Sequence, residues 1–247
     1  MSSTYRERAS RVPGAVVWTA TRAALCVTRI LPDGCMDVIW DGHGVLIAGP
    51  DTRAQLFVDD GSTLTGLRFA PGYAPRVLGQ PAHAFTDQRV PLGAVWSRER
   101  VERLVDALAT TDNPGRVLED ASLRVVTPDD NAERIETVAT LAARGENVAR
   151  IASAVGWSPR QLQRRSSDAF GYGAKTLERI LRFGRAVALA YDGTEFAAAA
   201  AWSGYADQSH LARDVKDLAG IPLGQLVAEG SVAKSSTALP SGSWTAA

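Results

Sequence analysis

The sequence predicts an α+β protein with a mostly antiparallel β domain first and an all-α domain second. Three observations indicate this division. Short apolar runs broken by Gly, Pro and Asp occupy residues 16–89, a pattern typical of strands. From about residue 97 onward, apolar residues recur at helical spacing instead. Within the second half, one helical pattern occurs twice, with a long helix between the copies.

The composition is that of a globular protein. The chain has 247 residues, 45% hydrophobic and 22% charged, which suits one large domain or two ordinary ones. Its 27 Lys and Arg balance 27 Asp and Glu, so the overall charge does not predict a general polyanion binder. The N-terminus is charged before any apolar run, and no segment approaches about 18 uninterrupted apolar residues. We therefore expect no signal peptide, no membrane span and a cytoplasmic location.

Five apolar segments are the predicted strands of the β domain. Turn signals such as PDG and DDG separate them, and their lengths suit an antiparallel sheet. The segments are AALCVTRI (23–30), CMDVIW (35–40), GVLIAG (44–49), AQLFV (54–58) and LTGLRF (64–69). An amphipathic helix is predicted from Val101 to Leu108, and a second short helix from Pro114. We expect the apolar face of the first helix to pair with a second copy in a homodimer.

Side chains with binding chemistry are sparse in this half. Cys26 and Cys35 flank a PDG turn, and are interpreted either as a soft-metal or thiol sensor or, preferably, as two small packed hydrophobes. Five aromatic residues line an effector pocket or belong to the core, and the sequence leaves both interpretations open. They are Trp40, Phe57, Phe69, Tyr73 and Trp96.

Nothing in the sequence predicts an enzyme. No two of the three histidines, His43, His83 and His210, lie at metal-ligand spacing. The chain also lacks a Gly-rich phosphate loop and a G-x-S-x-G nucleophile turn. We therefore predict no metal, no cofactor and no catalytic residues.

The turn-rich sequence PDDN, residues 128–131, marks the predicted domain boundary. We expect a β-rich sensor and dimerisation domain over residues 1–130, an all-α domain over 131–229 and a disordered tail over 230–247. In the all-α domain, Asn147 caps one short helix and Ser158 caps the next, with Pro159 and Gln161 completing a capping-box pattern. A longer helix follows over about residues 174–191.

The same unit then recurs at an offset of 48 or 49 residues. Gly204 corresponds to Gly156, Leu211 to Leu162, Arg213 to Arg164 and Gly220 to Gly171. A helix, a short turn with glycine and a second helix with polar residues at its start form a helix-turn-helix arrangement. In that arrangement the second helix enters the DNA major groove.

The first unit carries suitable groups for reading DNA. Arg160, Gln161, Gln163 and Arg164 flank the buried Leu162, and arginine pairs with guanine as glutamine does with adenine. Residues 160–185 hold seven basic side chains and two acidic ones, a concentration that suits phosphate contact. The phosphate candidates are Arg165, Lys175, Arg179 and Arg182. The alternative is a protein-interaction module with a merely solvated basic face; steep salt dependence would distinguish DNA binding from it.

Residues 134–228 resemble the arabinose-regulator (AraC/XylS) type of bacterial transcription factor. The resemblance rests on VARIASAVGWSPRQLQRRSSDAFG, the joining helix, and AAAAAWSGYADQSHLARDVKDLAGIPLGQL. It implies two helix-turn-helix units whose recognition helices lie in successive major grooves. The implied base-facing residues are Arg160, Gln163, Arg164, Gln208, Ser209, His210 and Arg213, with Gln161 a weaker candidate.

Two features depart from the family pattern or weaken it. Ser166 stands where the family usually has an aromatic residue, so we expect looser packing of the first recognition helix. Asp207, Asp214 and Asp217 lie in the second one, which predicts weaker DNA binding there.

The N-terminal half resembles a sensor domain found ahead of such DNA-binding units. The segments that carry this resemblance are LPDGCMDVIWDG, IAGPDT, GLRFAPGYAPRVLG and TDQRVPL. It implies a cupin-like regulatory domain that responds to a small-molecule effector, in a one-component regulator that acts on RNA polymerase.

Overall fold

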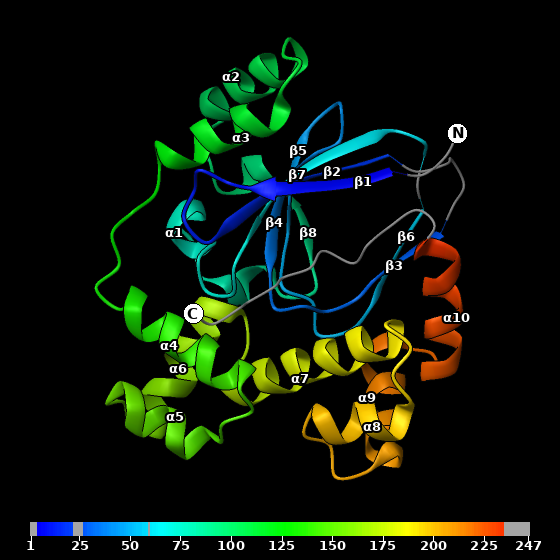
Figure 1. The fold of residues 1–247 in the computed structure, drawn as a ribbon. Helices are drawn as coiled ribbons and strands as arrows, with labels where there is room; N and C mark the ends of the chain where they lie inside the picture. The colour runs from blue at the N-terminus through cyan, green and yellow to red at the C-terminus, as the bar shows by residue number, and fades with distance from the viewer. Residues whose placement is uncertain (1–3, 22–26, 59, 235–247) are drawn as a thin grey trace.

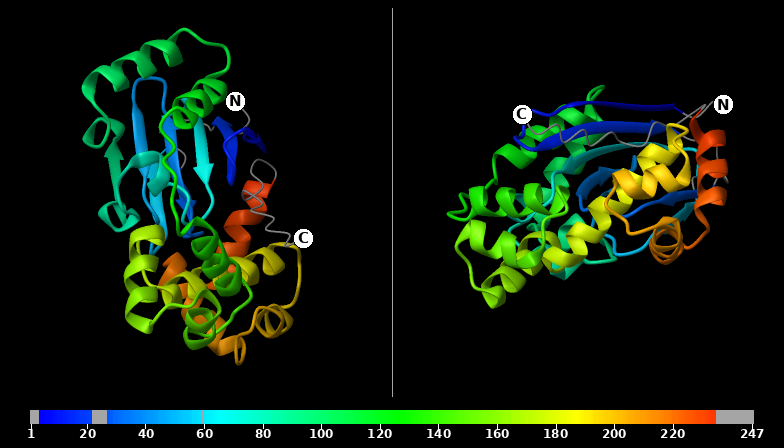
Figure 2. Two further views of the ribbon diagram at one scale, coloured as in Figure 1. Left: turned by 90° about the vertical axis from the view of Figure 1, so that its left-hand side faces the viewer. Right: turned by 60° about the horizontal axis from the view of Figure 1, so that its bottom comes forward.

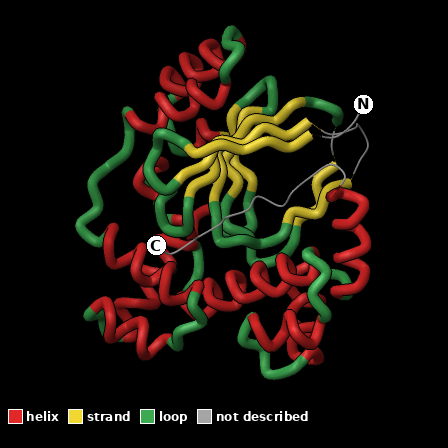
Figure 3. The backbone as a smooth tube through the Cα atoms, viewed as in Figure 1, coloured by secondary structure: helices red, strands yellow, loops and turns green. Residues whose placement is uncertain are grey.

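The computed structural model of the protein describes residues 4–21, 27–58 and 60–234. Six strands form one antiparallel sheet in the order β1-β2-β7-β4-β5-β8, and two further strands form the β3–β6 ribbon. The bounds are β1 (Thr4–Ala9), β2 (Ala15–Thr21), β3 (Val27–Ile30), β4 (Met36–Trp40), β5 (Val45–Ala48), β6 (Gln55–Val58), β7 (Thr63–Phe69) and β8 (Arg89–Pro91). The all-α half lies beneath this sheet (Figures 1 and 3). The predicted fold class is confirmed.

Each of the five predicted apolar segments contains a strand, β3 to β7. The five segments include none of β1, β2 and β8. The sequence of β1, TYRERA, has no apolar face, and its residues are half-buried or exposed. β1 is held by its antiparallel pairing with β2, from Thr4 opposite Thr21 to Ala9 opposite Val16. An edge strand of this kind depends on backbone hydrogen bonds, which leave little trace in side-chain pattern.

One face of the sheet forms the core of the β domain. Val17, Leu67, Val38 and Ile47 lie in adjacent strands, at most 5% exposed. They pack in one cluster with buried residues of α2 (Arg98–Ala109) and α3 (Pro114–Leu123). α1 (Pro75–Leu78) and the short helices η1 (Ala82–Phe85) and η2 (Leu92–Ala94) add to this cluster.

The apolar face of α2 is used within the chain. Leu104 and Leu108 are 6% and 2% exposed and belong to the β-domain core, with Val101 and Val105 packed beside them. The prediction that this face pairs with a second copy is therefore wrong, because its apolar residues are already buried in the β-domain core, where α2 packs on α3 and η2.

A buried carboxylate ties the start of the sheet to α3. Glu119 has no exposed surface and accepts hydrogen bonds from Arg8 Nη1 at 2.9 Å, Ser10 Oγ at 2.8 Å and the Arg11 backbone amide at 2.8 Å. Burial alone would raise the pKa of Glu119, but these hydrogen bonds outweigh it and lower the pKa from 4.5 to about 2. Glu119 is thus charged and fully paired in the folded protein.

The helical half contains two separate cores. Its helices are α4 (Ala132–Ala143), α5 (Val148–Val155), α6 (Pro159–Phe170), α7 (Ala174–Tyr191), α8 (Phe196–Trp202), α9 (Gln208–Ala219) and α10 (Leu223–Lys234). α4, α5 and α6 lie around one end of α7 and form the first core with it. α8, α9 and α10 lie around the other end and form the second core (Figure 1; Figure 2 shows two further views). None of the helices within the described part of the chain is both long and apolar enough to cross a membrane.

The predicted disordered tail begins too early. Residues 230–234 belong to α10, which the sequence did not predict, and Leu223 and Leu226 of this helix are buried in the second core. Residues 235–247 lie outside the described residues. The predicted boundary at residue 130 falls just before α4, which begins at Ala132.

Replacing Glu119 with glutamine is expected to lower the free energy of unfolding at pH 7 by about 3 kcal/mol, because the arginines lose a buried charged partner. Since the pKa is lower in the folded state, the carboxylate stabilises the protein fully above about pH 4.5. That stabilisation is lost as the pH falls towards 2. Chemical denaturation across this pH range measures both effects.

Glu99→Gln, on the exposed face of α2, is the matched control and should change stability by well under about 1 kcal/mol. An unchanged pH dependence in Glu119→Gln would contradict the assignment.

Candidate nucleic-acid interface

Local sequence signals build both helix-turn-helix units in the same way. In the first, α5 ends at Gly156 with φ 67°, and the Ser158 side chain accepts from the Gln161 amide to start α6. In the second, Gly204 has φ 84° and the Asp207 side chain accepts from the His210 amide to start α9. Glycine adopts this left-handed conformation without steric cost, so both turns follow from sequence.

The predicted capping box at α6 is present. The Gln161 side-chain oxygen accepts from the Ser158 backbone amide at 2.9 Å while the Ser158 hydroxyl oxygen accepts from the Gln161 amide at 3.3 Å. Gln161 is therefore occupied in capping, which agrees with its place as the weaker of the DNA-reading candidates.

The remaining candidates lie mostly on exposed faces. Leu162 and Leu211 are at most 1% exposed, whereas their polar neighbours face solvent. The exposed candidates are Arg160, Gln163, Arg164, Gln208, Ser209 and Arg213. His210 is half-buried, with its ring edge-on to Tyr205 at 5.0 Å between centroids. The structure thus presents one set of candidates at the start of each recognition helix.

The phosphate candidates have different surroundings. Lys175 is exposed at the start of α7. Arg165 is half-buried with its guanidinium 5.0 Å from the Trp157 ring centroid. Arg179 and Arg182 instead form ion pairs that join α7 to α9, so contact between these two and phosphate would compete with existing partners.

The α7–α9 ion pairs have short distances and a partly buried acid. Asp214, 7% exposed, lies 2.7 Å from Arg179 and 3.4 Å from Arg182, and Asp217 lies 3.0 Å from Arg179. Burial lowers the pKa of Arg179, but its hydrogen bonds and attraction to Asp214 and Asp217 outweigh this and raise it. The pairing offsets the charge of Asp214 and Asp217, two of the three acids behind the prediction of weaker binding by the second helix, whereas Asp207 accepts only the His210 amide.

Arg185 of α7 links the two units directly. Its guanidinium donates to the Ala143 carbonyl at the end of α4 and, at 3.4 Å, to the Ser203 carbonyl that follows α8. One side chain thus contacts the first unit and the second from the helix between them. The sequence shows an arginine here but not its two carbonyl partners.

Chemistry in the β domain is limited. The sensor interpretation of the two cysteines rests partly on Cys26, which lies outside the described residues. Burial and, after it, the charge of Asp33 raise the pKa of the Cys35 thiol well above 9.0, so this thiol is protonated at neutral pH. Within the described residues, no group of three or more His, Cys, Asp and Glu side chains is placed to hold a metal ion.

The aromatic residues separate into core and surface. Trp40, Phe69 and Trp96 are buried in the β-domain core, and Tyr73 packs against it. Phe57 is 40% exposed on the ribbon. Four of the five therefore serve as packing, as the core interpretation predicted.

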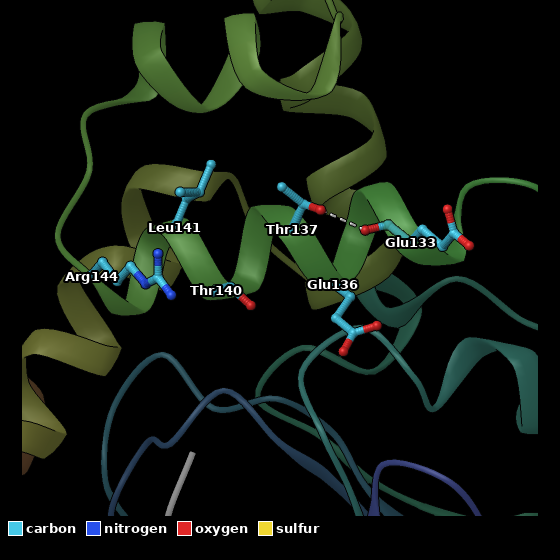
Figure 4. Close-up of a pocket in the computed structure, with 6 residues that line it drawn as sticks. All are labelled: Glu133, Glu136, Thr137, Thr140, Leu141 and Arg144. Carbon is cyan, nitrogen blue, oxygen red and sulfur yellow. Dashed lines mark hydrogen bonds between the residues drawn. The ribbon is translucent and has the colours of Figure 1, made fainter. Parts of the chain in front are cut away.

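One surface hollow lies along α4 (Figure 4). Its lining residues come from this helix and from its C-cap residue Arg144, and they are mostly polar: Glu133, Glu136, Thr137, Thr140, Leu141 and Arg144. The hollow touches neither recognition helix, so it adds nothing to the interface.

Comparison with known proteins agrees with this geometry. The profile of a family described as a helix-turn-helix domain matches residues 151–229, which span both units. The chain carries an AraC-type helix-turn-helix domain. It is therefore a DNA-binding transcriptional regulator. Residues 15–91, ahead of the AraC-type domain, match a family described as a domain of unknown function (DUF6597).

Solved structures of ToxT from Vibrio cholerae resemble the chain at low identity. One is 11% identical with a TM-score of 0.44, over 92% of this chain and 98% of that chain. Another, with a bound unsaturated fatty acid, is 11% identical with a TM-score of 0.46, over 89% and 96%. Neither likeness carries an inference about what this chain binds. No curated protein matched the chain.

Ser166, which stands where the family usually has an aromatic residue, carries a hydroxyl without a hydrogen-bond partner among the described residues. Ser166 is fully buried in the first core. Ser203 is also buried, and its hydroxyl likewise has no hydrogen-bond partner within the described part of the chain. A buried hydroxyl without a partner costs desolvation energy, which agrees with the looser packing expected at Ser166.

Replacing Ser166 with alanine is expected to raise the free energy of unfolding by about 1 kcal/mol, because the substitution removes a buried unpaired hydroxyl and favours helix. Ser167→Ala, one residue along the same helix and only half-buried, isolates the contribution of helix propensity and should gain less. Denaturant unfolding compares the two. Destabilisation by Ser166→Ala would show that the hydroxyl is hydrogen-bonded in solution.

Proposed function

We propose that the regulator reads sequence with both α6 and α9, placed in successive major grooves. The observation that carries this proposal is the equivalent display of polar side chains at the start of each helix, exposed and flanking a buried leucine. The proposed base-reading residues are Arg160, Gln163 and Arg164 in α6, and Gln208, Ser209, His210 and Arg213 in α9. Arginine suits guanine and glutamine suits adenine at base edges.

Two side chains would have to adjust on binding. A Cβ on Gly173 would lie 2.4 Å from Gln163 Oε1, so this amide rests against the start of α7. The His210 ring rests on Tyr205. Arg160, Arg164 and Arg213 have no such neighbour described, so we place the main base contacts on the arginines.

Phosphate contact is assigned more narrowly than the sequence suggested. We propose Lys175, which is exposed, and Arg165, which is held over Trp157, as phosphate ligands. Arg179 and Arg182 are proposed to orient α9 through Asp214. These assignments share one consequence, a steep decrease of DNA affinity with salt. An interaction module without DNA binding would lack it.

The β domain is proposed to be regulatory. On the sheet face opposite its core, Asp37 accepts from Trp18 Nε1 at 2.6 Å and from Arg68 Nε at 3.2 Å. The Nη1 atom of Arg68 is buried, has no hydrogen-bond partner among the described residues, and lies 3.7 Å from Asp33. A polar cluster with an unused hydrogen-bond donor at Arg68 Nη1 supports a response to a small-molecule effector. Cytoplasmic location, contact with RNA polymerase and a homodimer through the N-terminal half stay predictions.

Arg164→Ala is expected to weaken specific DNA binding by roughly 1–3 kcal/mol and to relax preference at one or two base pairs, as for a lost bidentate contact. Arg213→Ala tests the second helix, and because its neighbours Asp214 and Asp217 are paired with arginines we expect a comparable loss. Sites selected from random duplexes supply the probe, and titrations on selected and random DNA give the measurement.

Arg98→Ala, at an exposed position on α2, is the control and should bind as the parent does. Equal weakening on selected and random DNA would assign Arg164 to phosphate instead. If Arg213→Ala leaves specific DNA binding unchanged, base reading is restricted to α6.

Residues 131–234 are expected to fold alone, because they contain both cores, all caps and α10. This fragment should sediment as a monomer and bind one operator. If the intact chain is a dimer, DNA with two operators should bind it at least about tenfold more tightly than one operator does, through effective concentration. A monomeric intact chain without this gain would reject the dimer and leave DNA binding untouched.

A further inference from the structure

Both recognition helices end against the β domain. At the end of α6, the Thr86 hydroxyl donates to the Gly171 carbonyl at 3.0 Å. Gly171 has φ 85°, and a Cβ there would lie 2.5 Å from Pro50 Cγ and 2.7 Å from Thr86 Oγ1. The β domain therefore contacts the C-terminal cap of the first recognition helix closely enough to require glycine.

The equivalent end of α9 is held by different residues. Arg29 Nη1 donates to the Ala219 carbonyl at 2.9 Å, and the Ala54 backbone amide donates to the Leu218 carbonyl at 2.7 Å. Arg29 Nε also lies 3.3 Å from Glu229 of α10. The last carbonyls of a helix lack intrahelical donors and carry partial negative charge, so an arginine and a free amide suit them.

These contacts leave the DNA-reading surface free. Thr86, Arg29 and Ala54 meet residues 171 and 218–219, whereas the proposed base-reading residues occupy the opposite, N-terminal halves of α6 and α9. The β domain thus holds the two helices without covering the residues that read bases.

The helix between the units has a weak point at the junction of their cores. Leu177 and Ile180 of α7 belong to the first core, and Phe183 and Val187 to the second. Gly184 lies at this junction, exposed, and a Cβ there would meet nothing described within 4 Å. Glycine inside a helix destabilises it by about 0.5–1 kcal/mol relative to alanine, so bending is easiest here.

We propose that the β domain braces α7 across this junction and fixes the separation of the two recognition helices, with Arg29 and Thr86 as positioning residues for DNA reading. The inference rests on the proposed function of α6 and α9. Successive major grooves are about 34 Å apart along the duplex, so two linked helices bind well only at the matching separation. Any ligand that shifts the β domain relative to one helix end would change that match.

The test compares the intact chain with an Arg29→Ala/Thr86→Val double variant. The probe is the duplex selected by the parent chain, together with duplexes in which one or two base pairs are inserted or deleted between the two contacted segments. The parent should lose at least about tenfold in affinity for one inserted pair. The double variant should bind the best duplex about tenfold more weakly and vary less than about threefold across the series.

Two further variants separate positioning from general damage. Gly184→Ala stiffens α7 at a site with room for a methyl group, so adding it to the double variant should restore the steep dependence on spacing. Arg98→Ala should keep the parent profile. A double variant that is folded by thermal unfolding and retains the parent's spacing profile would overturn the proposal.

A measurement without DNA distinguishes failure of the brace from failure of the proposed function. Spin labels at the exposed positions 153 and 197 (Ser153→Cys and Ala197→Cys), in a chain with its native cysteines replaced by alanine, report the separation of α5 and α8. The distribution of distances between the two labels should be narrow in the otherwise unchanged chain and broad in the double variant. Equal widths would overturn the proposal. If the distance distribution broadens in the double variant but Arg164→Ala loses no specific DNA affinity, the brace stands and its role in DNA reading is rejected.

Discussion

The burial of one helix in two cores is the constraint on which the helical half depends. Leu177 and Ile180 of α7 enter the first core, and Phe183 and Val187 enter the second, all at most 1% exposed. Burying side chains of this size contributes about 1.5–3 kcal/mol each. Because both units must pack on the same helix, the spacing of these two apolar sets along α7 determines how the recognition helices are placed relative to each other.

Within that arrangement, the two units orient their recognition helices by different electrostatic means. Asp214 in α9 stands at the position that Arg165 occupies in α6, 49 residues earlier. Asp214 turns inward to Arg179 and Arg182, whereas Arg165 lies over the Trp157 ring. A buried charge is weak evidence for stability, but removing its partners would leave Asp214 as an uncompensated buried charge. The proposed role of this pairing is to hold α9 in the rotation that leaves Arg213 exposed.

The sequence predicted those features whose causes are local. Ser158, Pro159 and Gln161 start α6 within four residues, and Gly156 and Gly171 bound it, so cap and turn chemistry alone sufficed. β1 was not predicted, because an exposed edge strand is held by backbone pairing and needs no apolar pattern. The apolar face of α2 was visible, but whether it packs on its own sheet or on a second copy is a tertiary question.

The same limit applies to the candidate site. Counting charges between residues 160 and 185 indicates a basic segment, yet Arg179 and Asp214 lie 35 residues apart in the chain and meet only after folding. Local charge therefore predicted phosphate contact for a side chain that the fold pairs with a carboxylate. Conversely, the exposure of Arg160, Arg164 and Arg213 followed from the positions of Leu162 and Leu211, since helical periodicity fixes which neighbours of a buried residue face outward.

A recognition helix has two ends with unpaired backbone groups, and this protein uses them for separate purposes. Ser158 and Asp207 cap the N-terminal amides beside the proposed base-reading residues, while Thr86 and Arg29 reach the C-terminal carbonyls from the β domain. Because the proposed base-reading residues and the β-domain contacts lie at opposite ends of the same helices, DNA and the β domain would not compete for one surface. Under the proposed brace, regulation through these contacts would change the spacing of the two helices. It would then alter the fit to a complete two-groove site more than the affinity of either helix for its own groove.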